Sequence, residues 1–501
     1  MEVSKSVGPI DRSTVDALRR MAVVAASFLV VSLATYLVPG LDRVRPWVKG
    51  EGVPVLRLFT RETHADLPEF EGGNAAAAVQ SSQHEASGAP GHSATEGDMQ
   101  EGGSPPPAAG PGFTIDPSEY AEVQQTIENP SALEAFYGAL RRTAAAEPAA
   151  ITRVSHYGDS TIAADEITFT VRRKLQQRFG DAGHGFMLVA RGTMHYLHHD
   201  IEHRESSGWQ VQSIVERPLR NGFYGYGGVL AHGAAGEHSV FATVDKAPVG
   251  HSASRFELYY QRFPGGGDVR LSVDGAPVST VSTRSATVED AWQIVNVPDG
   301  KHLLSLRTFG NDVRLYGVVQ ERDVPGVVYD SVGLVGARAE RLLGADPEHM
   351  ARQIAHRSPD LLVLGFGGNE AGNEWLDPER YERELTKVVK LMRAGKPTMS
   401  CLLFAPLDQG ERNSRGDLVT LSVLPQIVEA QRRVARTEGC AFFDTFHAMG
   451  GPGSVARWFH RHPRLISSDF RHATPAGYQV IANLYYQALI KGFAEYLAKP
   501  R

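Results

Sequence analysis

The chain has 501 residues, and its 57 acidic and 51 basic side chains give a formal net charge of −6. This balance is mild for the length and gives no reason to expect nucleic acid as a partner. A chain of this length exceeds what one hydrophobic core usually holds, so we expect two folded modules plus non-globular segments.

Residues 21–38 form an apolar run without a charge that is just long enough to cross a bilayer. Arg19 and Arg20 precede it immediately. A cleaved signal peptide has a shorter apolar core and an Ala-x-Ala-like site, which this run matches poorly. We therefore expect an uncleaved, single-pass anchor in the inner membrane, with residues 1–20 in the cytoplasm and the rest in the periplasm or outside the cell. A cleaved signal peptide is the alternative.

Residues 72–112 are rich in Ala, Gly, Ser, Pro, Gln and Glu. This composition has too little apolar surface to form a core and predicts a disordered, flexible tether. An anchor followed by a tether holds the folded part at some distance from the membrane, which suits a polymer lying beyond it.

The folded part is expected from about residue 115, with a first buried strand from residue 151. The strand turns at Gly158-Asp159-Ser160 and enters a helix predicted over residues 161–179. Such a turn places the Ser160 hydroxyl at the carboxyl end of a sheet, where ligands bind in open α/β folds. The serine amide then lies beside the positive end of the helix, where developing negative charge is stabilised.

Residues 207–325 follow a different pattern, in which short alternating runs are separated by Gly, Asp and Pro turn signals. Strand spacing and turn density predict an inserted all-β sandwich of the jelly-roll type. The predicted strands are 239–244, 255–263, 268–273, 292–297, 302–309 and 313–320.

Strands and helices alternate again over residues 326–498, which predicts a parallel sheet covered by helices on both faces. The two cysteines, Cys401 and Cys440, lie in or beside predicted strands of this sheet and are too few for a disulfide framework. We expect buried free thiols, with one disulfide as the alternative if the chain is exported. The predicted strands are 327–332, 360–366, 398–404 and 441–444, and the predicted helices are 337–344, 347–357, 378–394, 423–438 and 475–497.

Three further blocks mark the ends of apolar runs or the start of the last helix. Residues 333–336 (Gly-Leu-Val-Gly) and 367–370 (Gly-Gly-Asn-Glu) each form a turn after a strand, as a donor to an oxyanion requires. Asp469 and His472 stand three residues apart just before a helix, so both can face one point. There the histidine can act as a base and the aspartate can fix its tautomer.

These blocks, in this order after Gly-Asp-Ser, resemble the GDSL/SGNH hydrolase family over most of residues 131–498, apart from the insertion. The resemblance implies a flavodoxin-like three-layer α/β sandwich, with residues 115–206 as the first part and 326–498 as the second part of a hydrolase domain. The insert narrows the resemblance to bacterial peptidoglycan O-acetylesterases, whose jelly-roll insert is similar to a carbohydrate-binding module. Thr161 and Val335 depart from that pattern, where His and Asn are usual, and this bears on substrate choice and rate more than on reaction class.

The resemblance also assigns roles to residues. Ser160 is the nucleophile, His472 is the base and later the acid, and Asp469 orients the histidine. The amides of Ser160 and Gly336 and the side chain of Asn369 surround the oxyanion. No metal or cofactor is expected, because acyl transfer to serine supplies its own nucleophile. No motif identifies the substrate-binding residues.

Each of these residues has a purely structural interpretation as well. Ser160 and Asp469 can act as helix caps, His472 can be a surface histidine, and Asn369 can close a turn. Gly336 can be needed only for its backbone freedom, and Gly333 is a rival for its role.

Two clusters invite other hypotheses. Histidines gather around residue 199 beside two acidic residues, but without a compact metal-ligand signature, so we expect a polar loop near the cleft. The cluster comprises His195, His198, His199 and His203. Aromatic residues of the insert can form a sugar platform, although aromatic residues in strands are more often core. They are Tyr224, Tyr226, Tyr259, Tyr260 and Trp292.

These expectations combine into a membrane-anchored serine esterase that removes O-acetyl groups from a cell-envelope polysaccharide, with peptidoglycan favoured. An O-acetyltransferase with the same triad is one alternative. A glycan-binding protein without activity is the other.

Overall fold

The computed structural model describes residue 113 and residues 115–120, 123–216, 219–244, 249–373 and 376–500. The expected anchor over residues 21–38 and the expected tether over residues 72–112 lie outside this part of the chain. Within it, no helix has the length and apolar character needed to span a bilayer.

Five parallel strands form the central sheet, in the order β13-β1-β14-β15-β18. Numbered by sequence, this order is 2-1-3-4-5, the flavodoxin-like arrangement that places ligands where the chain reverses direction across the sheet, between β1 and β14. All five strands are buried along their whole length or nearly so, as expected for a parallel sheet covered on both faces. Their bounds are Ile151–Gly158 (β1), Gly326–Gly333 (β13), Leu361–Gly365 (β14), Ser400–Phe404 (β15) and Ala441–Phe443 (β18).

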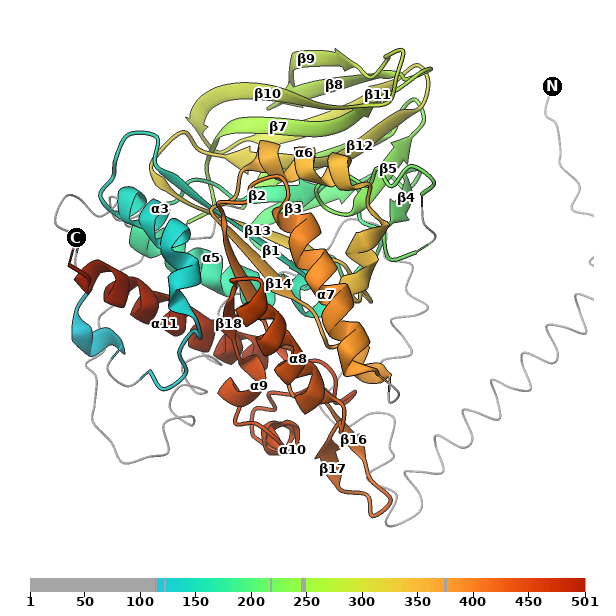
Figure 1. Cartoon of the computed structure of the whole chain (residues 1–501). Coiled ribbons are helices and arrows are strands. Elements are labelled where there is room, and N and C mark those ends of the chain that lie inside the picture. The colour runs from blue at the N-terminus through green and yellow to red at the C-terminus, as the bar shows by residue number, and fades with distance from the viewer. Residues whose placement is uncertain are drawn as a thin grey trace, which may run out of the picture. The chain divides into compact units, whose positions relative to one another are not determined.

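Helices cover both faces of this sheet (Figure 1). Alternate strand residues point to opposite faces, so Val154 joins the core under one helical layer while Tyr157 joins the other. The first layer contains α3 (Glu134–Ala144), α5 (Glu166–Phe179) and α11 (Pro475–Ala498), and the second contains α6 (Pro347–Arg357), α7 (Pro378–Arg393) and α8 (Leu424–Thr437). The predicted three-layer α/β architecture is confirmed.

Shorter elements complete this part of the fold. The 3-10 helices are η3 (Pro117–Tyr120), η4 (Pro130–Leu133), η5 (Ala339–Gly344) and η6 (Glu370–Gly372). Single turns or short helices are α4 (Ser160–Ala163), α9 (Thr445–Ala448) and α10 (Ser454–Phe459), and a small hairpin pairs β16 (Gly410–Arg412) with β17 (Leu418–Thr420).

Two antiparallel sheets interrupt the α/β pattern and share one apolar core. The first sheet has the order β10-β7-β12-β5-β4, with β2 also pairing to β12, and the second has the order β3-β6-β11-β8-β9. Since β2 and β3 belong to these sheets, strand pairing extends the sandwich upstream of the predicted start at residue 207. The bounds are Gly185–Leu188 (β2), Ile201–Glu205 (β3), Gln210–Ser213 (β4), Val229–Gly233 (β5), His238–Thr243 (β6), Ala253–Arg262 (β7), Asp268–Val273 (β8), Ala276–Ser282 (β9), Glu289–Gly300 (β10), Leu303–Phe309 (β11) and Val313–Glu321 (β12).

The expectation of free thiols is wrong, because Cys401 and Cys440 form a disulfide with a Cα–Cα distance of 4.7 Å. Strands β15 and β18 pair in parallel with Leu402 opposite Ala441. The two cysteines each precede those partners by one residue, so the strand register itself places them side by side.

The helix predicted over residues 161–179 is also interrupted. It divides into α4 and α5 at Asp165, which adopts a left-handed conformation with φ of 58°. The Asp165 carboxylate is fully buried and accepts two hydrogen bonds from the guanidinium of Arg172. Burial opposes its ionisation, but Arg172 holds the pKa of Asp165 well below its usual range. The ion pair therefore offsets the local cost of breaking the helix.

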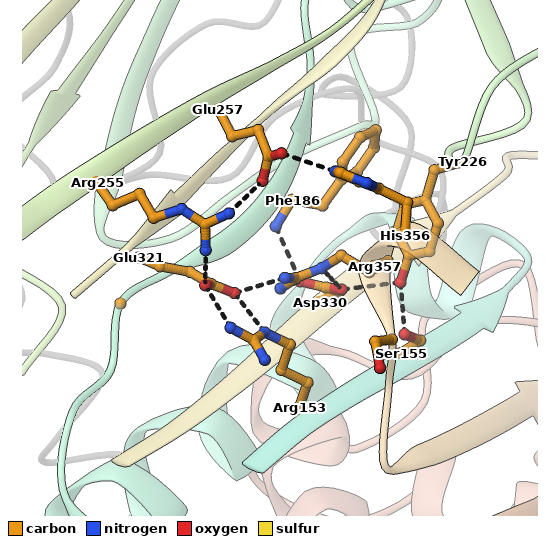
Figure 2. Close-up of polar contacts among 12 residues, drawn as sticks. Arg153, Ser155, Phe186, Tyr226, Arg255, Glu257, Glu321, Asp330, His356 and Arg357 are labelled. Carbon is orange, nitrogen blue, oxygen red and sulfur yellow. Dashed lines mark hydrogen bonds and ion pairs between the residues drawn. The ribbon is translucent and has the colours of Figure 1, made fainter. Parts of the chain in front are cut away.

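A buried network of charges joins the central sheet to the sandwich (Figure 2). Arg357, the last residue of α6, donates two hydrogen bonds of 2.8 Å to Asp330 on β13 and forms an ion pair with Glu321 on β12. Arg153 on β1 binds the same Glu321 carboxylate through two hydrogen bonds of 2.8 Å. On the sandwich side, the Tyr226 hydroxyl donates to Asp330 at 2.8 Å. Strands β1, β13 and β12 thus depend on one another for charge compensation.

We predict that Glu321→Gln lowers the free energy of unfolding by about 3–5 kcal/mol at neutral pH, because it leaves buried guanidinium groups without their partner. Burial raises the pKa of Glu321, but Arg357 and Arg153 outweigh that effect and hold it well below the usual range. The stabilisation is therefore present above the unfolded pKa near 4.5 and is lost as the pH falls towards the folded value.

Urea unfolding of the wild type and the variant at several pH values between 3 and 7 measures both effects, with a steeper acid loss expected for the wild type. Glu202→Gln is the matched control, since Glu202 pairs with Arg204 at the surface and both side chains are more than half exposed. Equal unfolding free energies for the two variants would show that the network contributes no stability.

Candidate active site

The turn after β1 places Ser160 at the carboxyl end of the sheet. Gly158 is required there, because a Cβ atom would lie 2.3 Å from the Ile162 side chain and 2.7 Å from the Gly365 carbonyl oxygen. Asp159 caps α4 by accepting a hydrogen bond from the Thr161 amide at 2.9 Å. Ser160 itself is therefore not the cap. It is the first residue of α4, where a backbone amide has no intrahelical partner.

The loop before α11 brings His472 to this serine. Its Nε2 atom lies 2.8 Å from the Ser160 hydroxyl oxygen, although 312 residues separate the two in sequence. The Nδ1 atom of His472 lies 2.6 Å from a carboxylate oxygen of Asp469. Thr474, not Asp469, caps α11. The three predicted triad residues therefore form a continuous hydrogen-bonded chain.

Asp469 also shapes the loop that carries the histidine. Its other carboxylate oxygen accepts hydrogen bonds from the amides of Arg471 and His472 at 2.9 and 3.1 Å. Burial raises the pKa of Asp469, but the hydrogen bonds from the imidazole and from these amides outweigh it, so the net shift is downward. The carboxylate is thus held ionised, which favours the tautomer that leaves Nε2 free to accept a proton.

The triad lies at the surface of the protein. The side chains of His472 and Asp469 are 42% and 48% exposed. Water and a bulky substrate can therefore both reach the serine without the opening of a lid.

The backbone at Gly336 fits a donor loop, whereas Gly333 has a packing role. Gly336 has a φ of 76°, and a Cβ atom there would meet nothing within 4 Å. A Cβ atom at Gly333 would lie 2.1 Å from the Ala163 amide nitrogen, so this glycine permits close packing of β13 against α4. Gly336 is therefore the better candidate for an exposed amide beside the site.

Asn369 lies at the end of β14, next to β1 in the sheet. Its side-chain amide donates to the Ala337 carbonyl at 2.9 Å and lies 3.4 Å from the Asp159 carboxylate. The first contact fixes the amide to the loop after β13, while the second is long for a hydrogen bond. One N–H group of Asn369 is thus held weakly and is available to an oxyanion.

Sequence reasoning missed the part played by Glu370. Its two carboxylate oxygens accept hydrogen bonds from the Ala339 amide at 2.8 Å and from the Gly367 amide at 3.1 Å. The side chain therefore ties the loop that contains Gly336 to the loop that contains Asn369. Its position directly after Asn369 in a Gly-Gly-Asn-Glu turn was the available signal, but its partner across the sheet was not visible in the sequence.

The histidine cluster does not converge on one point. His198 forms hydrogen bonds with His184 and Tyr196. His199 pairs with Glu166, and His203 contacts the Val189 carbonyl. These contacts tie the loop after β2 to α5 and to the sandwich.

The hypothesis of an aromatic sugar platform is wrong. Tyr224, Tyr226 and Tyr259 are at most 1% exposed, and Tyr260 is buried as well. Trp292 is partly buried and stacks on His356 with ring centroids 3.9 Å apart. Most of these rings lie in the core where the first sandwich sheet packs against the α/β part, whereas Tyr260 lies in the core between the two sandwich sheets.

Comparison with known proteins gives one family match and several similar solved structures. Residues 307–480 match the GDSL-like Lipase/Acylhydrolase family. The nucleophile turn lies upstream of this match, because the sandwich separates it from the other blocks. No curated protein sequence matches the chain.

Among solved structures, a peptidoglycan O-acetylesterase is 24% identical over 74% of this chain and 98% of its own, with a TM-score of 0.61. This likeness shows a shared fold. The salicylyl-acyltransferase SsfX3 from a tetracycline biosynthetic pathway is 14% identical over 61% of this chain and 96% of its own, with a TM-score of 0.28. A family two carbohydrate esterase from Clostridium thermocellum is 12% identical over 57% of this chain and 98% of its own, with a TM-score of 0.24.

The environment of Glu370 predicts a measurable pH dependence. Burial raises its pKa to about 7, against the opposing effect of the amide hydrogen bonds. A carboxyl group with a raised pKa stabilises the fold fully below its unfolded value of about 4.5, and this contribution is lost as the pH rises to about 7.

Glu370→Gln keeps a neutral side chain at every pH, so its stability relative to the wild type should improve by about 3 kcal/mol between pH 4.5 and pH 8. Thermal or urea unfolding across this range tests the prediction. Glu379→Gln, at a position 87% exposed, is the control and should show no such trend. If the difference in unfolding free energy between Glu370→Gln and the wild type does not change with pH, the carboxyl group is already ionised throughout this range.

Proposed function

We propose that this GDSL-type chain is a serine esterase that removes O-acetyl groups from a cell-envelope polysaccharide, with O-acetylated peptidoglycan as the favoured substrate. The observation that carries the proposal is the hydrogen-bonded chain from Ser160 through His472 to Asp469. A serine hydroxyl within 2.8 Å of an imidazole, which in turn contacts a carboxylate, is the arrangement that activates serine for acyl transfer.

The proposed reaction has two acyl-transfer steps. In the first, His472 takes the proton of Ser160 as the serine oxygen attacks the acetyl carbonyl, and the negative charge moves to the carbonyl oxygen. The amides of Ser160 and Gly336 and the side chain of Asn369 donate to that oxygen. The tetrahedral intermediate then collapses, the imidazolium protonates the departing sugar oxygen, and the acetyl group remains on Ser160.

In the second step, His472 takes a proton from water as the water attacks the acetyl-serine. The bond between the acetyl carbon and the Ser160 oxygen then breaks, the imidazolium returns its proton to Ser160, and acetate is released. The exposure of His472 and Asp469 supports hydrolysis over transfer, because water has direct access to the acyl-enzyme. A transferase needs to exclude water from this intermediate. Activity towards a sugar acceptor is therefore the second candidate, and the open site disfavours it.

We also propose that the enzyme works outside the cytoplasm, held by the anchor over residues 21–38 and reaching its polymer through the tether over residues 72–112. The Cys401–Cys440 disulfide supports this location, since disulfides persist in oxidising compartments. The inserted sandwich would be the jelly-roll-like, carbohydrate-binding-like module that the sequence resemblance implies.

Replacing Ser160 with alanine should reduce hydrolysis of a small acetyl ester at least about 10⁴-fold, because the nucleophile is removed while the oxyanion donors remain. Steady-state kinetics with p-nitrophenyl acetate measures the loss, and circular dichroism checks that the fold is retained. Ser468→Ala is the matched control, since Ser468 is an exposed serine next to Asp469 and should keep wild-type rates. Full activity of Ser160→Ala would reject the mechanism.

Substrate choice is tested by acetate release from O-acetylated peptidoglycan, acetylated xylan and acetylated alginate at matched acetyl content. We expect the highest kcat/KM on peptidoglycan and little transfer of acetyl groups to a chitooligosaccharide acceptor. Preference for xylan would reject the peptidoglycan assignment, and efficient transfer would favour the acyltransferase alternative.

A further inference from the structure

The loop that carries His472 is strongly basic in a protein that is acidic as a whole. Residues 457–472 contain four arginines and one acidic residue, Asp469, whereas the chain has a net charge of −6. The Asp469 carboxylate is already engaged by His472 and two backbone amides. Residues 457–472 therefore carry more basic than acidic side chains beside the site.

One arginine of this segment and one from the hairpin of β16 and β17 flank a pair of aromatic rings at this loop. The rings of Phe459 and Phe470 meet edge to face with centroids 4.9 Å apart. The guanidinium of Arg464 lies 4.6 Å from the Phe459 ring centroid, and that of Arg412 lies 5.3 Å from the Phe470 centroid. Phe470 stands two residues before His472, so the ring pair is connected to the loop that carries the imidazole.

Arg412 is the last residue of β16, and the hairpin of β16 and β17 lies next to α10 (Figure 1). The amide of Gly410, at the start of β16, donates to the Phe470 carbonyl at 2.9 Å. The Arg412 guanidinium also donates to the Gly416 carbonyl at 2.7 Å across the tip of the hairpin. Its position relative to the loop of His472 is thus fixed by backbone and side-chain contacts.

Both arginines are exposed, and neither has an ion-pair partner among the described residues. Most arginines elsewhere in this part of the chain do pair with a carboxylate: Arg153, Arg172, Arg173, Arg178, Arg191, Arg204, Arg255, Arg262, Arg284, Arg314, Arg322, Arg352, Arg357, Arg383, Arg432 and Arg433. A guanidinium that is stacked on a ring is pre-organised, and the N–H groups of Arg412 that do not bind the Gly416 carbonyl remain for an incoming carboxylate.

We infer that Arg412 and Arg464, with the ring pair of Phe459 and Phe470, form an arginine–aromatic clamp that binds carboxylate groups of the acetylated polymer beside the reacting ester. This inference rests on the proposed esterase function and narrows its substrate to acetylated glycans that bear carboxylates on the sugar or on attached peptides. Neutral acetylated glycans lack the group that the clamp recognises.

Binding and catalysis are measured separately in the full chain. Ser160→Ala protein is sedimented with insoluble O-acetylated peptidoglycan, with and without Arg412→Gln and Arg464→Gln. The same polymer with its carboxylates amidated by carbodiimide chemistry is the second probe, and phosphatidylglycerol vesicles are the third. Arg383→Gln with Arg436→Gln is the matched control, because both arginines are exposed and lie on α7 and α8.

The clamp variant should bind native peptidoglycan at least about fivefold more weakly at low salt, and the difference should shrink at high salt. Amidation of the polymer should weaken binding of the unsubstituted clamp to the same extent. When the clamp variant keeps Ser160, its kcat/KM should fall on peptidoglycan and remain unchanged on p-nitrophenyl acetate. Unchanged activity on the small ester also shows that the variant is folded.

Equal binding by the clamp and control variants, or undiminished binding to the amidated polymer, would overturn the inference. A clamp variant that loses binding to the vesicles but still binds peptidoglycan as strongly as the control would overturn it too. That result would identify anionic lipid as the occupant. These outcomes are separate from failure of the esterase proposal, which would appear as absence of acetyl-ester hydrolysis by the wild type. If the protein with both Arg412→Gln and Arg464→Gln does not fold, the two single variants are measured in its place.

Discussion

The compensation of Arg357 by Asp330 and Glu321 is the interaction on which the arrangement of the molecule depends. The three side chains are almost wholly buried, and each comes from a different element: α6, β13 and β12. A charge buried without its partner is costly, so these elements are held together as one unit. Strand β13 carries Asp330 and pairs with β1 along its whole length, and β1 also joins the network directly through Arg153. The joint therefore supports the strand that carries Ser160 and the strand that leads to Gly336.

The candidate site follows from the order of the strands. Strands β13, β1 and β14 are neighbours, so the loops that contain Gly336, Ser160 and Asn369 meet at one edge of the sheet. Glu370 links the outer two of these loops through backbone amides. The loop of His472 adds the imidazole from outside the sheet and, through Phe470, is bonded to the hairpin that carries Arg412. Chemistry and the proposed recognition of the polymer thus share a single loop.

Much of this arrangement could be predicted from local patterns. Apolar runs and turn residues located the strands of the central sheet to within about two residues, and the motif order predicted that Ser160, His472 and Asp469 would meet. The features that were missed depend on partners distant in sequence. The break at Asp165 requires the buried Arg172, and the disulfide requires the register of β15 against β18. Most of the aromatic residues of the insert are buried because its first sheet packs on the α/β part, which no local pattern records.

The central claim is that His472 and Asp469 activate Ser160 as a nucleophile. Labelling with a fluorophosphonate probe, followed by peptide mass spectrometry, tests it most directly, because only an activated serine reacts readily with such a reagent. The account predicts a single modified residue, Ser160, and loss of the modification in folded His472→Ala protein. Absence of labelling at Ser160, or equal labelling without the histidine, would contradict it.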